Sequence, residues 1–415
     1  MRYHQLAIVC GWLFVAATAF GQDAPAKRPQ PKEQPPQAAP APAPQPVETA
    51  APVSFEPAFP SEIIWFKTDF LLWSVPNSNV PFPVVTTGTP TDDCFAGVIG
   101  NPNTSVLFGN QNFSNDHTSG LRVTLGGWLD NSHDYGIEAS GFTIFRETHA
   151  AVFSSDKSGN PGLYLSGFNT QLNREDSAII ADPLQKFGGT IRVATDLGLF
   201  GVEINGLFNI RRNANFEWTF LSGARYLDFR ESFGVSAVSR DLILNQQITL
   251  DDQFKSSNQF LGYQAGSRMR WRAGNWLFDL TGKLALGGNQ RTVLINGRST
   301  SGGPDATNPG NFVGGFYAQP SNIGRETDIV MCIMPAVELK LAYQITSGMI
   351  ASIGYDMMYL NQTVRVANQV DRNLNLSQSA VLGSPAPAAP LTPRRGLDSS
   401  DLFVNGLSLG LEIRY

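Results

Sequence analysis

Apolar and polar residues alternate strictly at the end of the chain. The stretch VNGLSLGLEIRY (404–415) has an apolar residue at every second position and finishes on an aromatic one; these positions are Leu407, Leu409, Leu411, Ile413 and Tyr415. Because successive side chains of a β-strand point to opposite faces of a sheet, this pattern predicts a strand with one apolar face. Such a strand fits the edge of a soluble sandwich, and it also fits a membrane barrel whose outward face contacts lipid.

The same alternation recurs in five earlier segments, which read WFKTDFLLW, GLRVTLGGWL, GVEINGLFNIR, NWLFDLTGKLALGG and PAVELKLAY. One face of each segment is apolar, and the other is rich in Gly, Ser, Asn and Thr with sparse charges of both signs. Two stretches, 135–145 and 216–229, have apolar residues on both faces, so the pattern leaves their orientation open. A polar face of small residues with few charges favours the lumen of a barrel over the solvated face of a sandwich.

The alternating segments predict an antiparallel, all-β, up-and-down transmembrane barrel of about twelve strands. We expect these strands near residues 63–73, 119–130, 135–147, 198–211, 215–230, 231–243, 257–271, 275–287, 289–298, 328–344, 348–361 and 402–415. No uncharged apolar run approaches the roughly 18 residues that a membrane-spanning helix needs. The membrane would therefore be crossed by strands.

Loop lengths favour the barrel as well. The four long gaps, 74–118, 148–197, 299–327 and 362–401, all have odd numbers in the strand order, so a periplasmic N-terminus would place all of them outside the cell. Short turns separate several of the other strands. Four long structureless loops would be unusual in a compact soluble domain. Aromatic residues near strand ends suit an interfacial girdle, and those residues are Trp65, Phe66, Trp73, Trp271, Trp276 and Tyr415.

The N-terminal region divides into two parts that precede the barrel. Residues 1–21 have an early Arg2 followed by an apolar run and small residues, which predicts a cleaved signal peptide. Residues 22–60 contain 12 of the 27 prolines and are rich in alanine, which predicts a disordered periplasmic segment. That segment is either a simple spacer or a tether to the cell wall or a partner. Residues 61–415 form the expected outer-membrane barrel, which places the chain in the outer membrane.

Charge and cysteine content limit the remaining possibilities. Removal of residues 1–21 leaves 29 basic residues against 35 acidic ones, a formal charge of −6, which disfavours a nucleic-acid partner. Cys94 and Cys332 are the cysteines outside the signal peptide, and they could pair in an oxidising compartment. The spacing of His and Cys residues suggests no metal site.

The sequence shows no convincing catalytic site. GLSLG (406–410) echoes the G-x-S-x-G pattern, but it lies within a predicted strand and lacks the strand-to-helix turn of a nucleophile elbow. The acidic pairs in TLDDQF (249–254) and PTDDC (90–94) resemble solvated turns more than calcium ligands. We therefore expect a protein that is not an enzyme and has no cofactor and no metal.

Several stretches resemble the beta-barrel porin family of BBP type, outer-membrane proteins found mainly in planctomycete bacteria. The matching stretches run in order through residues 61–415 and include SGLRVTLGGWLD (119–130), GIEASGF (136–142), SGARYLDFRE (222–231), LGYQAGSRMRW (261–271), KLALGGNQRTVLINGRS (283–299), AQPSNIG (318–324), GYDMMYLNQTVRVANQVDRNLN (354–375) and the final strand. The resemblance implies an outer-membrane barrel, and it implies no particular transported substrate. The terminal aromatic strand also matches the signal that barrel-insertion machinery recognises, so this machinery and outer-membrane lipid are the expected partners.

The alternation predicts which charged residues line the lumen. By phase these are Arg122, Glu203, Arg211, Asp279, Lys283, Glu338, Lys340, Glu412 and Arg414. In particular, Lys283 should face the lumen and Leu284 should face lipid. Opposed charges across an open pore would set its ion preference, whereas paired charges would plug it. The leading hypothesis is passive diffusion of small polar solutes or ions; the alternatives are a non-conducting surface or adhesion barrel that presents long loops and, less favoured, an outer-membrane hydrolase.

Overall fold

The computed structural model describes residues 63–75, 80–90, 95–110, 118–306, 308–383 and 391–415, all within one compact unit that spans Phe55–Tyr415. The predicted signal peptide and the Pro/Ala-rich segment lie outside the described residues. No helix within the described ranges is long and apolar enough to cross a membrane.

The described residues are dominated by strands. Their bounds are β1 (Ile64–Ser74), β2 (Pro83–Gly88), β3 (Thr104–Gly109), β4 (Thr118–Trp128), β5 (Tyr135–Ser154), β6 (Leu163–Asn169), β7 (Arg174–Ala181), β8 (Phe187–Arg212), β9 (Phe216–Asp241), β10 (Gln247–Ala273), β11 (Trp276–Gly302), β12 (Gly310–Val313), β13 (Gly324–Thr346), β14 (Met349–Val364), β15 (Asn373–Leu374) and β16 (Ser399–Arg414). Two short 3-10 helices, η1 (Val366–Gln369) and η2 (Leu376–Gln378), follow β14.

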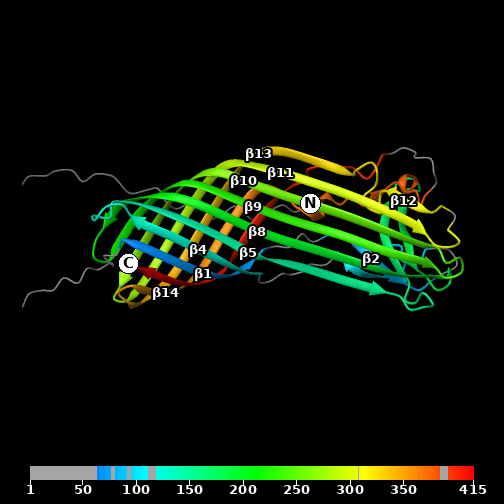
Figure 1. The fold of residues 1–415 in the computed structure, drawn as a ribbon, viewed down its shortest axis with the longest axis horizontal. Helices are drawn as coiled ribbons and strands as arrows, with labels where there is room; N and C mark the ends of the chain where they lie inside the picture. Colours follow the sequence, from blue (N-terminus) through cyan, green and yellow to red (C-terminus); the bar gives the residue numbers. More distant parts are fainter. Residues whose placement is uncertain (1–62, 76–79, 91–94, 111–117, 307, 384–390) are drawn as a thin grey trace, which may run out of the picture. The chain divides into compact units, whose positions relative to one another are not determined.

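Ten of these strands form a closed antiparallel barrel (Figure 1). Their order around the ring is β10, β9, β8, β5, β4, β1, β16, β14, β13 and β11, and β11 pairs again with β10. The first and last strands close the ring, from Trp65 opposite Arg414 to Ser74 opposite Asn405. Closure through backbone hydrogen bonds satisfies the polar groups that would otherwise be exposed to lipid.

The ring confirms the predicted barrel, with ten strands rather than about twelve in its described part. The segments expected at 215–230 and 231–243 are one continuous strand, β9, and those at 275–287 and 289–298 are one strand, β11. At about 3.3 Å per residue, the 26 residues of β9 extend roughly 85 Å, whereas crossing the membrane needs only about 9–11 tilted residues. These strands therefore continue well beyond the hydrocarbon layer.

Long and short connections fall at opposite ends of the ring. Five connections lie at one end, which we call the loop end: 75–117, 155–186, 242–246, 303–323 and 365–398. Four short turns lie at the other end, which we call the turn end: 129–134, 213–215, 274–275 and 347–348. Figure 1 shows the C-terminus at the turn end and β2 and β12 at the loop end.

The long strands exchange their apolar and polar faces part of the way along. In the turn-end half of β9 the outward residue Phe220 is exposed and the inward residue Arg225 is charged. In the loop-end half the outward residues Asp228 and Arg230 pair with each other, while the inward residues Phe229 and Phe233 are fully buried. The outward apolar belt therefore covers only the turn-end half, and an apolar core fills the loop-end half from inside.

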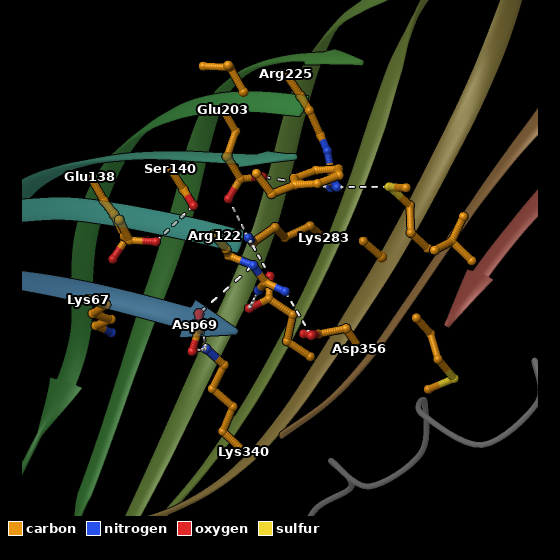
Figure 2. A pocket seen from close by; sticks show the side chains of 18 of the residues that line it. Lys67, Asp69, Arg122, Glu138, Ser140, Glu203, Arg225, Lys283, Lys340 and Asp356 are labelled. Carbon is orange, nitrogen blue, oxygen red and sulfur yellow. Dashed lines mark hydrogen bonds and ion pairs between the residues drawn. The ribbon is translucent and has the colours of Figure 1, made fainter. Parts of the chain in front are cut away.

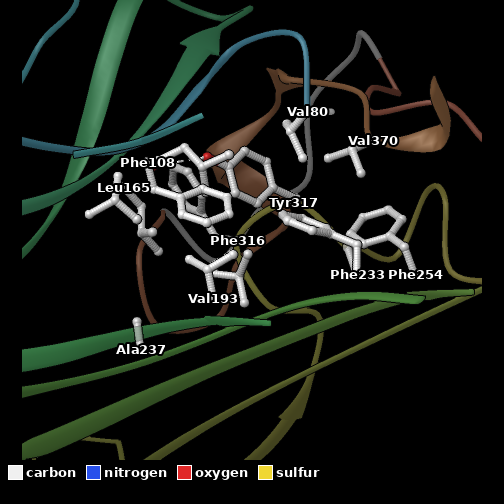
Figure 3. Packing of buried hydrophobic residues seen from close by; sticks show 14 of the residues in the cluster. Val80, Phe108, Leu165, Val193, Phe233, Ala237, Phe254, Phe316, Tyr317 and Val370 are labelled. Atoms are coloured by element: carbon white, nitrogen blue, oxygen red, sulfur yellow. Dashed lines mark hydrogen bonds between the residues drawn. The ribbon is translucent and has the colours of Figure 1, made fainter. Parts of the chain in front are cut away.

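That core joins the barrel wall to a smaller sheet made by the loops. The smaller sheet has the order β15, β6, β2 and β3, and β7 pairs with β6. Its buried residues pack with inward residues of β8, β9, β10 and β11 in one apolar cluster, which Figure 3 shows around Tyr317; members include Val84, Val85, Leu163, Leu165, Ile180, Val193, Phe233, Phe254, Val293, Phe316 and Val370. We call the loop segments in this cluster the plug. Each fully buried large side chain contributes about 1.5–3 kcal/mol to holding it in place.

Two tryptophans differ from the expected girdle. Trp65 and Trp73 are almost fully buried and point inward, where their indole N–H groups donate to Glu138 and Asp356. Both side chains point to the same inward face of β1 as Lys67 and Asp69. A position near the end of a strand is therefore not sufficient evidence that an aromatic residue faces lipid. Trp276 and Tyr415 are exposed on the outward side, as expected.

Candidate functional site: the charged lumen

The lumen of the turn-end half is filled by charged side chains. Seven acidic and eight basic inward residues take part in ion pairs, and they are Asp69, Glu138, Glu203, Asp279, Glu338, Asp356 and Glu412, with Lys67, Arg122, Arg225, Arg268, Arg270, Lys283, Lys340 and Arg414. They come from β1, β4, β5, β8, β9, β10, β11, β13, β14 and β16, so every strand of the described ring contributes. The set is close to electrically neutral.

Arg122 on β4 is the centre of the largest group (Figure 2). Its guanidinium lies 2.8 Å from Asp356, 3.2 Å from Glu338 and 3.9 Å from Asp69. It also lies over the ring of Trp73, 5.4 Å from the ring centroid. A planar guanidinium suits this position because its several donors can serve more than one carboxylate at once.

Lys283 on β11 extends the same group across the lumen. Its Nζ lies 2.5 Å from Glu203 and 2.8 Å from Glu338. Its neighbour Leu284 is 48% exposed on the outward face, whereas Lys283 is buried. With Lys340, whose Nζ contacts both oxygens of Asp69 at 3.0 Å, the ion pairs form one chain across the barrel.

Three separate groups of ion pairs lie nearer the turn end. Arg268 donates to both oxygens of Glu138, at 2.7 and 3.1 Å. Arg270 makes the same two-pronged contact with Asp279, at 2.6 and 2.7 Å, and Glu412 pairs with Lys67 and Arg414. In the two arginine–carboxylate pairs of Arg268 and Arg270, two parallel hydrogen bonds make the contact strong and fix the geometry of both side chains.

Only small cavities remain between these side chains. Three of them have volumes of about 60, 40 and 20 Å³, and Lys67 lines all three. The largest reaches from Lys67 to Asp356 and the second lies beside Arg212 and Arg414 at the turn end. A water molecule needs roughly 10–15 Å³, so each of these three cavities has room for a few waters at most.

An apolar layer crosses the lumen above the charges. It is made by inward residues of most strands, and its members include Leu71, Ile144, Leu199, Leu227, Phe229, Phe260, Met334, Met358, Leu360 and Leu402. The plug lies on the loop-end side of these residues, because the same strands continue into the apolar cluster around Tyr317. The lumen therefore changes from charged to apolar along its axis.

Buried polar side chains of the wall bind the chain where β14 ends and the plug segment after it begins. Asn258 on β10 accepts from the Val364 N–H at 2.7 Å and donates to the Val364 carbonyl at 2.9 Å. Glu231 on β9 accepts from the Arg365 guanidinium through both of its oxygens and from the Val366 N–H at 3.1 Å. These contacts satisfy loop backbone groups that would otherwise be buried without partners.

Eight of the nine sequence-predicted lumen residues point inward and make ion pairs; they are Arg122, Glu203, Asp279, Lys283, Glu338, Lys340, Glu412 and Arg414. Arg211 is the exception, because it is exposed beside the turn that ends β8. A register shift between Asn209 and Arg211 inserts one residue into the strand and reverses its phase. Arg212 lines the turn-end cavity instead.

Sequence reasoning missed several inward charges. Glu138 and Arg225 lie in the two stretches that are apolar on both faces, where the phase could not be assigned. Arg268 and Arg270 alternate with the outward residues Met269 and Trp271, so the two-residue period could have revealed them. Asp356 precedes two methionines, Met357 and Met358, which hide the alternation in that segment of β14.

The remaining candidates have no catalytic or metal-binding arrangement in the described chain. Ser408 of the GLSLG echo is buried, and its Oγ has no hydrogen-bond partner that could serve as a base. No group of three or more His, Cys, Asp or Glu side chains within the described ranges is placed to hold a metal. Cys332 is buried on β13, and Cys94 lies outside the described residues.

The outward residues of the final strand continue the apolar belt. Leu407, Leu409, Leu411 and Tyr415 are exposed, and Ile413 is partly so. The Tyr415 carbonyl accepts the N–H groups of Ile63 and Ile64, at 2.9 and 3.0 Å, next to the start of β1. The segment proposed as an assembly signal therefore also completes the ring.

Comparisons with known proteins give one family. The model of the family described as Putative beta barrel porin-7 (BBP7) matches residues 65–415. No curated protein matches the chain. Among solved structures, the chain is similar to outer membrane protease OmpT from Escherichia coli, with 10% identity and a TM-score of 0.38 over 86% of this chain and 97% of that chain. It is also similar to the P. putida toluene transporter TodX, with 6% identity and a TM-score of 0.20 over 86% of this chain and 92% of that chain. Likenesses of this size say nothing about activity.

Proposed function

The chain belongs to the Putative beta barrel porin-7 family of outer-membrane β-barrels, and we propose that it is a barrel closed along its axis that acts through its loop end. In this view the apolar belt anchors the protein in the membrane. The strand extensions and the plug form a folded platform beyond the lipid. The observation that carries the proposal is that paired charges, an apolar layer and the plug follow one another along the lumen.

The charged layer supports closure because its groups are already paired. A permeating ion would have to separate contacts such as Arg122 with Asp356 or Lys283 with Glu203. Removing one partner from a buried ion pair costs about 3–5 kcal/mol, and an ion in transit would impose a cost of that kind at several positions. A barrel of this width lies near the eight-strand case, in which side chains fill the interior.

The apolar layer supports closure for a second reason. A hydrated solute that passed the charges would next meet apolar side chains such as Phe229, Phe260 and Leu360, which are fully buried. Transfer of a polar group into such surroundings without a hydrogen bond costs roughly 2–7 kcal/mol. The platform would then be the part that meets other molecules.

Porin-like passive diffusion of small polar solutes or ions is the second candidate. Its support is the series of water-sized cavities that share Lys67 and reach the turn end beside Arg414. Opposed charges around such cavities would select ions if the plug and the apolar layer moved aside. This candidate therefore requires a large displacement of the loop segments, and the closed barrel requires none.

Conductance measurements on the full chain in planar bilayers separate the two candidates. We expect no discrete steps from the wild-type protein in several salts. The variant Glu231→Ala/Asn258→Ala/Arg122→Ala/Phe229→Ala loosens the plug and also removes one side chain each from the charged and the apolar layer, so it should produce frequent steps, which also shows that the barrel has inserted. A matched control, Asp228→Ala/Asn296→Ala, changes outward residues and should stay silent. Regular steps from the wild-type protein would overturn the closed barrel and favour diffusion.

A further inference from the structure

The barrel wall is not fully paired at its loop-end half. Pairing between β13 and β14 ends at Ala336 opposite Met358, whereas β13 pairs with β11 as far as Gly324 opposite Ile295. Above that point β14 pairs with β16 alone. In the described structure, residues 325–335 of β13 therefore have a neighbouring strand on one side only. We call the boundary between these residues and 359–364 of β14 the seam.

The sequence accounts for the place where pairing stops. Pro335 is the first residue past the last pair, and its ring nitrogen has no hydrogen to donate. The next available donor, the Ile333 N–H, bonds to the side-chain oxygen of Asn361 at 2.8 Å rather than to the backbone of β14. Gln362 has a positive φ of 56°, and the register of β14 against β16 shifts between Leu360 and Thr363. A proline on one strand and a bulge on the other therefore part the two strands.

Apolar residues lie on both sides of the seam. The outward residues Ile329 and Met331 are 72% and 76% exposed, compared with 52% for Leu286 in the paired wall beside them. The inward residues Cys332, Met334, Met358 and Leu360 are buried and belong to the apolar layer of the lumen. Only this one layer of side chains separates the outward apolar belt from the apolar interior.

The side chains at the seam are unusually adaptable. Four of the seven methionines in the chain lie in the seam or directly beside it: Met331 and Met334 on β13, and Met357 and Met358 at the last paired positions of β14. Methionine has an unbranched, flexible side chain with a polarisable sulfur, and it recurs at surfaces that accommodate variable apolar ligands. Without a ladder of backbone bonds, movement of these side chains is enough to open a path.

We propose that the seam is a lateral binding site in which an acyl chain from the surrounding leaflet inserts between β13 and β14. The chain would pack along Met331 and Ile333 outside and against Met334 and Leu360 inside. This goes beyond the proposed function, since a barrel closed along its axis still exchanges apolar molecules sideways. Ile333 pairs across β11 with Leu286, which lies at the loop-end limit of the apolar belt, so the seam begins at the depth where acyl chains are present.

A strand from a partner protein fits the seam less well than an acyl chain. Strand addition requires a regular row of free donors and acceptors along an edge. Here Pro335 offers no N–H and Asn361 already occupies the N–H of Ile333. An acyl chain needs no hydrogen bonds, so these interruptions do not weaken its binding.

Photo-cross-linking tests the proposal with the full chain in nanodiscs that contain a fatty acid with a mid-chain diazirine. Outward belt residues such as Leu284 should be labelled in any case and report successful insertion. We expect labelling of Met334 to exceed that of Ala285 several-fold. Ala285 is the matched control because it is the direct cross-strand partner of Met334, is also inward and fully buried, and lies in the paired wall.

Two variants identify the route of the label. Pro335→Val restores a backbone donor and should reduce labelling of Met334 while leaving Leu284 unchanged. A disulfide between Met334→Cys and Leu360→Cys, in a Cys332→Ser background, joins the positions that would pair next in the register, and it should abolish inward labelling at the seam. Inward labelling at positions 332 and 334 that is absent, equals that of Ala285, or survives both variants would overturn the proposal.

Discussion

The Asp252 carboxylate, on β10, accepts the backbone N–H of Tyr317, in the β11–β13 loop, at 3.1 Å. The same carboxylate accepts the N–H groups of Phe316 and Ala318, at 3.0 and 2.9 Å. One wall residue thus holds three consecutive residues of the plug, beside the fully buried ring of Tyr317. This contact lies in the loop-end extension of β10, outside the apolar belt, where the outward neighbours are polar.

The stability of the plug should depend on pH through Asp252. Burial raises the pKa of this carboxyl to about 6 from an ordinary value of 3.8, although the three backbone N–H groups lower it. Because the folded-state pKa is raised, its contribution to stability is full below the ordinary value and is lost as the pH rises through about 6. The effect is on the order of 3 kcal/mol between pH 4 and 8.

Urea unfolding of the purified barrel at several pH values measures this contribution. In the Asp252→Asn variant, the free energy of unfolding should decrease less than in the wild type as the pH rises from 4 to 8, because the amide does not ionise. Asp251→Asn is the matched control, because Asp251 is the outward neighbour and bonds to Ser236 at 2.7 Å. If the wild type and Asp252→Asn have the same pH profile, Asp252 does not titrate in this range.

Removal of the Lys283 charge should destabilise the barrel strongly. The Lys283→Met variant leaves Glu203 and Glu338 buried without their shared ammonium group. We expect a loss of about 3–5 kcal/mol in the free energy of unfolding. The triple variant Lys283→Met/Glu203→Gln/Glu338→Gln should recover part of this loss, whereas Lys255→Met, at an outward exposed position, should have little effect. An unchanged unfolding midpoint for Lys283→Met would contradict a network held by ion pairs.

Chemical labelling should detect the exchange of faces along β11. Leu284 lies in the outward apolar belt, and Gln290 lies on the same outward face closer to the loop end. In nanodiscs, and in a background without other cysteines, a charged maleimide should label Gln290→Cys but not Leu284→Cys, and an apolar maleimide should label both. Equal reaction of the two positions with the charged reagent would place Leu284 in water and refute the membrane orientation.

The terminal aromatic ring should affect assembly more than stability. Tyr415 makes its closing contacts with Ile63 and Ile64 through backbone atoms, which the Tyr415→Ala variant retains. We therefore expect less folded protein in the outer membrane of cells but an unchanged unfolding midpoint after refolding in detergent. The measurement is the folded fraction on semi-native gels. Tyr135→Ala, which removes an exposed ring from an internal strand, should assemble normally.

The two-residue period predicted the wall because lipid and lumen impose opposite requirements on neighbouring residues. It identified Lys283 and Leu284 correctly by phase, since the pattern around them is unbroken. It failed at Arg211, where a bulge reverses the phase, and a bulge leaves no compositional mark in this sequence. It also split β9 and β11, because their faces exchange polarity and the alternation is interrupted where it inverts.

The plug could not be derived from the sequence for a different reason. Segments such as β2 and β6 are short, and their side chains are buried by parts of the chain far away in sequence. The Tyr317 hydroxyl donates to the Ser166 carbonyl at 2.7 Å, although the two residues lie 151 positions apart in the sequence. Local pattern carries no information about such packing, so these segments could be recognised only as long gaps.

The exchange of polarity along β9 and β11 fixes how deeply the protein sits in the bilayer. Sinking by two residues, roughly 5 Å for a tilted strand, would bring Asp228 and Gln290 toward hydrocarbon. Rising by the same distance would expose Leu286, at the loop-end limit of the apolar belt, to water. The outward residues thus fix the position of the membrane boundary on the barrel. A membrane of a different thickness would have to adjust to the barrel, because it could not shift the barrel along the membrane normal.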